Sequence, residues 1–280
     1  MKLVRYGKPG AEQPGMIDGE TLRDLSGVVD DIDGAALDDA TLDRLRALDP
    51  TELPEVKGNI RLGPCVGNIG KFLCIGLNYS DHAAEQGLPI PAHPILFFKA
   101  NSAIVGAHDD VVMPRGSKRS DWEVELGVVI GKTCKYVSKR DALDHVAGYC
   151  IVNDVSEREF QQNLTGQWTK GKSCDTFGPT GPYLVTRDEV ADPQNLAMAL
   201  DVNGQRMQTG NTSTMIFSVA EIIEHLSGLM TLHPGDVIST GTPPGVGDGM
   251  KPQTYLKVGD VMELEIEGLG RQRQEVKQDA

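Results

Sequence analysis

The hydrophobic pattern of residues 121–130 alternates along its length and predicts a β-strand. One face carries apolar side chains at every second position, Trp122, Val124, Leu126, Val128 and Ile130. The other face carries Glu123 and Glu125, followed by Gly127 and Val129. Because side chains two apart on a strand are roughly 7 Å apart at Cα, the two carboxylates repel each other and favour a cation between them. A hard divalent cation with oxygen ligands is the natural candidate.

A second stretch of the chain shows that this spacing alone is not specific. Residues 262–267 alternate in the same way, and their three glutamates are interpreted as the solvent-facing side of an antiparallel strand. A metal site at Glu123 and Glu125 therefore has to be argued from the polar residues that accompany them.

The rest of the pattern predicts short strands and few helices. Strands are expected at residues 2–6, 71–76, 94–99, 148–154 and 237–240, with a hairpin piece at 15–19. Helices are expected at residues 39–48, 80–87 and 156–161, and after Ser218, which forms a capping box with Glu221. Pro and Gly punctuate residues 49–70, which are interpreted as a linker. We expect a small N-terminal domain at 1–65 and a larger domain at 66–280.

Composition and charge narrow the class of partner. The 280 residues include 27 Lys and Arg against 40 Asp and Glu, a net charge of -13, which disfavours nucleic acid and anionic membranes as partners. A small anionic substrate is still compatible with local positive groups or a metal. The chain starts without an apolar signal region, and no apolar run has the length of a membrane-spanning helix. Five scattered cysteines without C-x-x-C spacing indicate reduced thiols in a cytoplasmic protein.

A third carboxylate lies at the end of another apolar strand. Residues 148–154 read Gly-Tyr-Cys-Ile-Val-Asn-Asp, and a carboxylate where a buried strand gives way to a loop is a common ligand position. Asp154 would complete a three-carboxylate oxygen site with Glu123 and Glu125, leaving positions for water and substrate.

His82 and Glu85 are three residues apart on the helix expected at 80–87, with Ser80 or Asp81 as its cap. A carboxylate partner orients an imidazole and raises its basicity, as a general base acting on water requires. An exposed helix pair without a role is an equally good interpretation of the sequence.

Other polar residues fall where a pocket would need them. The helix at 156–161 projects Arg158 and Gln161, and Lys172 lies in a Gly- and Pro-rich segment, where it is either a charge-stabilising group or an ordinary loop lysine. The loop at 240–247 is glycine-rich and either approaches a small anion or forms a tight turn. It lacks the G-K-[ST] ending of a nucleotide loop.

Taken together and in order, these motifs resemble the fumarylacetoacetate hydrolase family. The matching elements are residues 76–79, the Glu123-x-Glu125 strand, Asp154 with Arg158 and Gln161, Lys172-Ser173, residues 213–217 and residues 240–247. The resemblance covers about residues 66–280 and is nearest to the bacterial branch of 2,4-diketo-3-deoxy sugar acid hydrolases, often labelled ureidoglycolate lyase. It implies an α+β, mainly β fold, with a mixed β-roll catalytic domain, a small N-terminal domain and a homodimer.

The resemblance also implies roles for individual residues. Glu123, Glu125 and Asp154 would bind Mg²⁺ or Mn²⁺, sometimes Ca²⁺, and His82 with Glu85 would be a catalytic dyad on a lid. Lys172 would support negative charge, and the remaining pocket residues would be Arg158, Gln161, Thr242, Asn78 and Tyr79. Two positions depart from the family pattern: Leu77 stands where several members carry Arg, and Asp121-Trp122 precede the first ligand where some carry His.

The chemistry that this resemblance implies is hydrolysis of a carbon–carbon bond in a 2,4-diketo acid, giving pyruvate or a related acid. Stabilisation of an enolate by a metal would also serve decarboxylation of a β-keto acid such as oxaloacetate and isomerisation of a dienedioate. Ureidoglycolate cleavage is a further alternative. A binding protein for a metal and a small acid, without turnover, is the alternative from another class. The position of His82 and Glu85 relative to the metal site separates that class from an enzyme.

Overall fold

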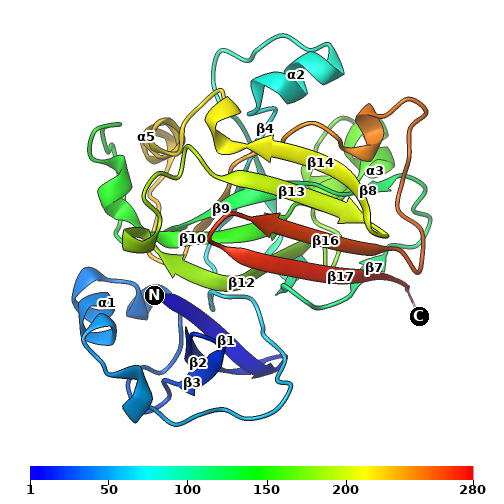
Figure 1. Cartoon of the computed structure of the whole chain (residues 1–280). Coiled ribbons are helices and arrows are strands. Elements are labelled where there is room, and N and C mark those ends of the chain that lie inside the picture. Colours follow the sequence, from blue (N-terminus) through cyan, green and yellow to red (C-terminus); the bar gives the residue numbers. More distant parts are fainter. Residues whose placement is uncertain (280) are drawn as a thin grey trace.

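The computed structural model describes residues 1–279 and is built mainly from β-strands (Figure 1). The larger sheet has ten strands. Nine follow one another in the order β3 (Thr21–Asp24), β2 (Ala11–Asp18), β1 (Lys2–Lys8), β12 (Gly178–Thr186), β10 (Val146–Asn153), β9 (Val124–Ile130), β15 (Val237–Ser239), β4 (Phe72–Gly76) and β5 (Ile95–Lys99). The tenth strand, β6 (Ile104–Gly106), pairs with β12. The sheet is mixed, because β15 and β4 run parallel within an otherwise mostly antiparallel order.

A second sheet of five strands faces part of the first. Its order is β14 (Gln205–Asn211), β13 (Ala197–Val202), β16 (Val261–Ile266), β17 (Gly270–Gln278) and β7 (Val111–Met113). A separate pair joins β8 (Ser120–Asp121) to β11 (Ser156–Glu157). On β16, Glu263 is exposed while Met262 and Leu264 are buried. The expectation that this stretch has a wet glutamate face is therefore confirmed.

Helices are few and short, as the pattern predicts. They are α1 (Asp39–Arg46), α2 (Ser80–Gln86), α3 (Arg158–Asn163), α4 (Thr169–Lys172) and α5 (Val219–Leu229). The capping box of Ser218 and Glu221 opens α5 as expected. The cap of α2 differs from the prediction: Tyr79 is its N-cap residue and makes no side-chain cap bond, while Gly87 ends the helix in the left-handed conformation. The carboxylate of Asp81 instead accepts from the N–H of His82 (2.9 Å).

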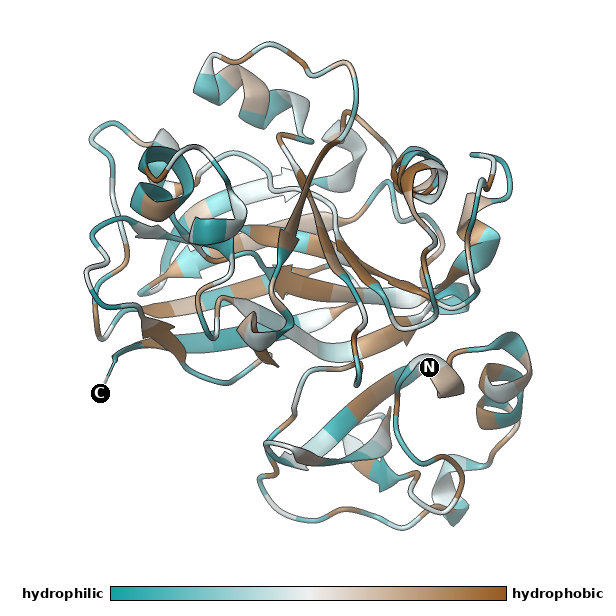
Figure 2. Ribbon diagram, turned by 180° about the vertical axis from the view of Figure 1, so that it is seen from behind, coloured by the Kyte–Doolittle hydropathy of each residue, from teal (hydrophilic) through white to brown (hydrophobic). Residues whose placement is uncertain are grey.

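The two faces of the large sheet pack against different partners. Val124, Leu126 and Val128 of β9 share one hydrophobic core with the second sheet and with α5. Val129 and Val152 belong to a separate core that they form with the N-terminal segment. This division follows from the two-residue period of a strand, and the apolar residues of the central strands are plain in Figure 2.

The N-terminal segment docks directly on the large sheet. Strand β1 pairs with β12 through Lys2 and Leu3, so the sheet continues into this segment, which forms the blue lobe of Figure 1. Residues 49–70, interpreted as a linker, also contact the fold, because Cys65 and Val66 are buried and Leu62 bridges to Tyr6. The boundary at residue 65 stays a prediction. Within residues 1–279, no helix has both the length and the apolar character needed to cross a membrane.

The predicted strand at 121–130 is interrupted. Asp121 pairs with Ser156 in the small β8–β11 pair, whereas Val124 begins β9 opposite Asn153 of β10. Residues 122 and 123 lie between the two strands, opposite residues 154 and 155, and the pairing keeps the same register on both sides of this gap. The alternation of faces nevertheless persists across the break, since Trp122 is buried in the core with Val124.

Candidate metal and active site

Three buried carboxylates meet at the end of the β9–β10 ladder. Glu125 lies opposite Val152 in the β9–β10 ladder. Asp154 follows β10, and its backbone N–H donates to the carbonyl of Glu123 (2.9 Å). One carboxylate oxygen from each of Glu123, Glu125 and Asp154 lies within 4.8 Å of the others. The strand ladder therefore brings together the three acids that the sequence predicts as one site.

Cations hold two of these acids. The ammonium of Lys172 donates to Glu123 (2.8 Å) and to Asp154 (2.6 Å). Arg158 lies 2.7 Å from the second oxygen of Glu123, and Lys99 donates to the second oxygen of Asp154 (2.5 Å). All three cations are buried, so these charge-assisted bonds are strongly held. Lys172 is thus no ordinary loop lysine.

Glu125 has a different environment, because no cation among residues 1–279 bonds to its carboxylate. One of its oxygens accepts from the hydroxyl of Ser239 (2.5 Å) and from the N–H of Gly241 (2.9 Å). Burial and the charges of Asp154 and Glu123 raise the pKa of Glu125 well above its usual value. Burial also acts to raise the pKa of Glu123, but Lys172 and Arg158 hold it well below its usual range. The site is therefore short of positive charge on the Glu125 side.

This donor set fits a hard divalent cation. Three carboxylate oxygens within 4.8 Å of one another have a separation close to twice a cation–oxygen bond of about 2.0–2.6 Å. An added cation would favour the ionised form of Glu125. Oxygen-only donors select Mg²⁺, Mn²⁺ or Ca²⁺ over softer ions.

Gly241 places its N–H against Glu125 through a conformation that other residues rarely adopt. Its φ is +98°, and an added Cβ would lie 2.7 Å from the Cβ of Asn78. We expect Gly241→Ala to cost about 1–3 kcal/mol of stability from backbone strain, to cost more from the clash, and to weaken Mn²⁺ binding. Urea denaturation and calorimetric Mn²⁺ titration measure the two effects.

Gly259→Ala is the matched control for that substitution. Its φ is +94°, but an added Cβ would meet nothing within 4 Å. It should therefore show the strain cost alone, with unchanged Mn²⁺ affinity. Equal Mn²⁺ affinity in both variants would contradict a role for the Gly241 N–H in holding Glu125.

The predicted dyad forms at the edge of the same cavity. Nδ1 of His82 lies 3.0 Å from Glu85 on α2, and the other oxygen of Glu85 accepts from the N–H of Gly245 (3.0 Å). Glu85 can accept a hydrogen bond from the Nδ1–H of His82, and in that tautomer Nε2 is the ring nitrogen that can take a proton. His82 lines the cavity together with Glu123 and Glu125. The bond to Gly245 joins α2 to the glycine-rich loop, so the pair is tied to the site.

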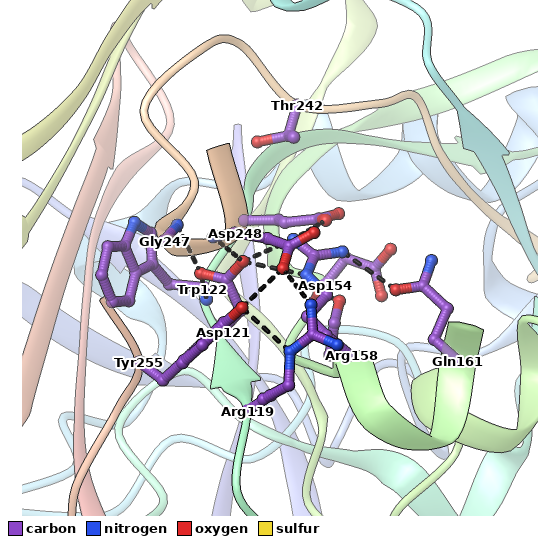
Figure 3. Close-up of polar contacts among 12 residues, drawn as sticks. Arg119, Asp121, Trp122, Asp154, Arg158, Gln161, Thr242, Gly247, Asp248 and Tyr255 are labelled. Atoms are coloured by element: carbon purple, nitrogen blue, oxygen red, sulfur yellow. Dashed lines mark hydrogen bonds and ion pairs between the residues drawn. The ribbon is translucent and has the colours of Figure 1, made fainter. Parts of the chain in front are cut away.

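Asp121 is a site residue that the sequence analysis left without a role. Its carboxylate accepts from Arg158 (2.7 and 2.9 Å) and from the N–H groups of Gly247 (2.7 Å) and Asp248 (3.0 Å) (Figure 3). Arg158 in turn donates to Gln161 (3.1 Å). Asp121 therefore holds Arg158 beside Glu123, and it also holds the backbone of residues 247 and 248 in place. Strand alternation offered the signal, because residue 121 shares a face with Glu123 and Glu125.

Lys99 is the second residue without an earlier role. It occupies the same inward face of β5 as Phe97, and its ammonium also donates to the carbonyl of Val155 (3.0 Å). A lysine at an inward position of an apolar strand is rare unless it is paired. The position of Lys99 in the sequence therefore indicates that it has a buried acidic partner.

The cavity has a volume of about 410 Å³, and the predicted pocket residues divide into two groups. Arg158, Gln161, Lys172 and Thr242 line it, although the hydroxyl of Thr242 is already engaged with the carbonyl of Val124 (2.9 Å). Asn78 and Tyr79 are not among the residues that line it.

Asn78 and Tyr79 have structural contacts in place of the predicted substrate contacts. The amide of Asn78 donates to the carbonyls of Phe217 and Thr240 and accepts from the N–H of Phe217. The Tyr79 hydroxyl, fully buried, contacts the sulfur of Met198 (3.2 Å). Asn78 therefore joins the segment after β4 to the segments before α5 and after β15.

Sequence comparison places most of the chain in one family. Residues 71–277 match the family model described as "Fumarylacetoacetate (FAA) hydrolase C-terminal". A Burkholderia multivorans (strain ATCC 17616 / 249) protein named "Putative hydrolase" is 60% identical over 276 residues, with 98% of each chain covered.

Solved structures match over the whole chain. The fumarylacetoacetate hydrolase of Exiguobacterium antarcticum is 35% identical, with a TM-score of 0.87 and 100% of both chains covered. The 2-hydroxyhepta-2,4-diene-1,7-dioate isomerase of Mycobacterium marinum is 34% identical, with a TM-score of 0.77 and 100% and 99% covered. The maleylpyruvate hydrolase of Sphingobium sp. SYK-6, in complex with manganese (II) ion and pyruvate, is 28% identical, with a TM-score of 0.84 and 100% of both covered. The chain belongs to the fumarylacetoacetate hydrolase family.

Proposed function

We propose that this protein is a divalent-metal-dependent hydrolase that cleaves the C3–C4 bond of a 2,4-diketo acid and releases pyruvate or a related acid. The observation that carries the proposal is that His82 lines the same cavity as Glu123 and Glu125. A basic nitrogen next to a cation site is what activation of water beside a bound keto acid requires. The maleylpyruvate hydrolase with manganese and pyruvate supports the same reaction class.

Each residue has a defined task in this reaction. Nε2 of His82, oriented by Glu85 through Nδ1, takes a proton from water as the water oxygen attacks C4. The C3–C4 bond then breaks, its electron pair passes to C3 and the C2 oxygen as an enolate, and the protonated His82 returns a proton to C3. Glu123, Glu125 and Asp154 would hold a divalent ion, which would supply Lewis-acid stabilisation of the negative charge that develops on the enolate. Lys172 adds further positive charge at the floor of the cavity.

Isomerisation of a dienedioate is the second candidate, because a similar structure carries that name. An isomerase moves a proton within its substrate and needs no activated water. In that reaction the His82–Glu85 pair would not have to activate water. A non-catalytic binding protein is disfavoured because His82 lines the same cavity as Glu123 and Glu125, where a binding protein has no need of a base.

A substrate panel tests the proposal. Acetylpyruvate, a diketo-deoxy sugar acid, oxaloacetate and a dienedioate are each incubated with Mg²⁺ and with Mn²⁺, before and after chelation. Hydrolysis gives pyruvate plus a second carboxylic acid, decarboxylation gives CO₂, and isomerisation gives neither. Metal-dependent release of both acids supports the proposal, and isomerisation without hydrolysis of any diketo acid would overturn it.

A further inference from the structure

The walls of the cavity differ chemically from its floor. The floor carries the carboxylates and their cations, whereas most of the wall is apolar, formed by Ile75, Leu77, Leu88, Ile90, Ile95 and Trp168. Leu88 and Ile90 come from the segment between α2 and β5, which lies at the top of Figure 1. An apolar wall gains free energy when it covers apolar ligand surface.

Part of this apolar wall is open to solvent. Leu88 is 51% exposed and Ile90 is 63% exposed, although both line the cavity. Leu77 has a φ of +50°, a conformation that is uncommon for leucine. The backbone thus accepts a strained residue beside the cavity, and two large apolar side chains there lack a covering group.

The charges of the lining leave no partner for a second carboxylate. Within residues 1–279, the cavity is lined by two cationic residues besides His82. These are Arg158 and Lys172, and both are paired with buried acids. The remaining charged lining residue away from the floor is Asp248, whose carboxylate accepts from Arg119 and from the hydroxyl of Tyr255. An anionic tail would meet an acid and no free cation. A polyhydroxylated tail would find amide partners in Gln86, Gln161 and Gln162, of which Gln161 is bonded to Arg158 and Gln162 to Asp248, and would otherwise leave hydroxyl groups against apolar side chains.

We propose that the substrate tail beyond C4 is apolar and uncharged, and that Leu88 and Ile90 determine this specificity. This inference rests on the proposed function, and it selects an acylpyruvate with an alkyl or aryl tail over a diketo-deoxy sugar acid. It also separates this chain from similar structures whose names specify a dioate or maleylpyruvate, because those compounds carry a second carboxylate.

A matched pair of substrates provides the test. Succinylpyruvate and 4-methylpentanoylpyruvate have tails of nearly equal shape, and only the first ends in a carboxylate. With Mn²⁺ present, we expect kcat/KM to favour the branched alkyl tail by on the order of 10²-fold, because an unpaired carboxylate would lose its hydration against apolar side chains. Along straight-chain acylpyruvates, kcat/KM should rise by up to about fourfold per methylene until the wall is covered.

Ile90→Lys tests the assigned residue. Because Ile90 is exposed, the substitution should not disturb folding, and it should narrow the preference for the alkyl tail by up to about fivefold through a partly screened attraction for the carboxylate. Leu88→Lys should act in the same direction. Leu229→Lys is the control, since Leu229 is also exposed (58%) but lies on α5 and does not line the cavity.

The outcomes separate the two proposals. Equal or better turnover of succinylpyruvate by the unmodified protein would overturn the apolar tail while leaving the hydrolase proposal intact. An unchanged preference in both lysine variants would overturn the assignment of Leu88 and Ile90. Absence of turnover with every acylpyruvate, including acetylpyruvate, would instead overturn the proposed function.

Discussion

Replacing His82 by alanine is expected to lower kcat for acylpyruvate hydrolysis by roughly 10²–10⁴-fold, the usual contribution of a positioned general base. KM and Mn²⁺ affinity should stay close to those of the unmodified protein, because His82 bonds to Glu85 and to none of the three cluster acids. Alanine also favours the helical conformation of α2. Steady-state kinetics with pyruvate detection and calorimetric Mn²⁺ titration measure these quantities.

Two further variants make the His82 experiment decisive. Glu85→Gln should lower kcat less than His82→Ala, because the base remains and only its orientation and charge partner change. Ala84→Ser, an exposed position on the same helix, should leave kcat unchanged and so controls for disturbance of α2. Turnover that survives in His82→Ala but disappears on chelation would favour the decarboxylase or isomerase alternative.

Replacing Glu123 or Glu125 by glutamine is expected to weaken Mn²⁺ binding similarly but to change stability differently. Without metal, Glu123→Gln should lower the free energy of unfolding by roughly 2–3 kcal/mol, because Lys172 and Arg158 each lose a charged hydrogen-bond partner. Glu125→Gln should cost less than about 1 kcal/mol, since Ser239 and Gly241 still donate to the amide oxygen. Urea denaturation in the presence of a chelator measures the difference.

Added metal then reveals the shared effect of the two substitutions. Saturation at 100 times Kd stabilises a folded protein by about 2.7 kcal/mol. Both variants should lose about half or more of this gain at the Mn²⁺ concentration that saturates the unmodified protein, because removing a ligand costs at least the roughly 10–100-fold in affinity that an outer-shell partner costs.

Glu263→Gln is the matched control for this pair. Glu263 occupies the same alternating pattern on β16 but is exposed. The Glu263→Gln variant should therefore keep the stability and the Mn²⁺ affinity of the unmodified protein. Unaltered Mn²⁺ affinity in Glu123→Gln and Glu125→Gln would contradict metal binding by the three carboxylates. Equal destabilisation of the two variants without metal would contradict the difference in their cation partners.

Local patterns predicted most of the elements and the main acids of the site. The alternation in residues 121–130 assigned Glu123 and Glu125 to one face, and the apolar run before Asp154 placed that acid at a strand end. Both predictions agree with the structure, because alternation and strand ends are properties of neighbouring residues. The mainly β fold and the family were also predicted correctly.

The structure differs from the sequence pattern where distant segments decide the surroundings of a residue. Asn78 and Tyr79 belong to a motif of the family, yet their side chains bond to segments more than 100 positions away and leave the cavity to others. The break in the central strand at residues 122 and 123 has the same origin, because a strand continues only as far as its partner does. No local pattern contains the position at which β10 ends relative to β9.

By itself, the sequence determined which residues face inward, where the chain turns and that three acids lie on or next to strands at positions suited to a cation. Only the tertiary structure decided that Lys99, Lys172 and Arg158 neutralise Glu123 and Asp154 but leave Glu125 without a cation, and that the wall above them is apolar. The physical reason is that periodicity fixes the direction of a side chain relative to its own strand, whereas charge balance and cavity shape depend on which segments meet across the fold.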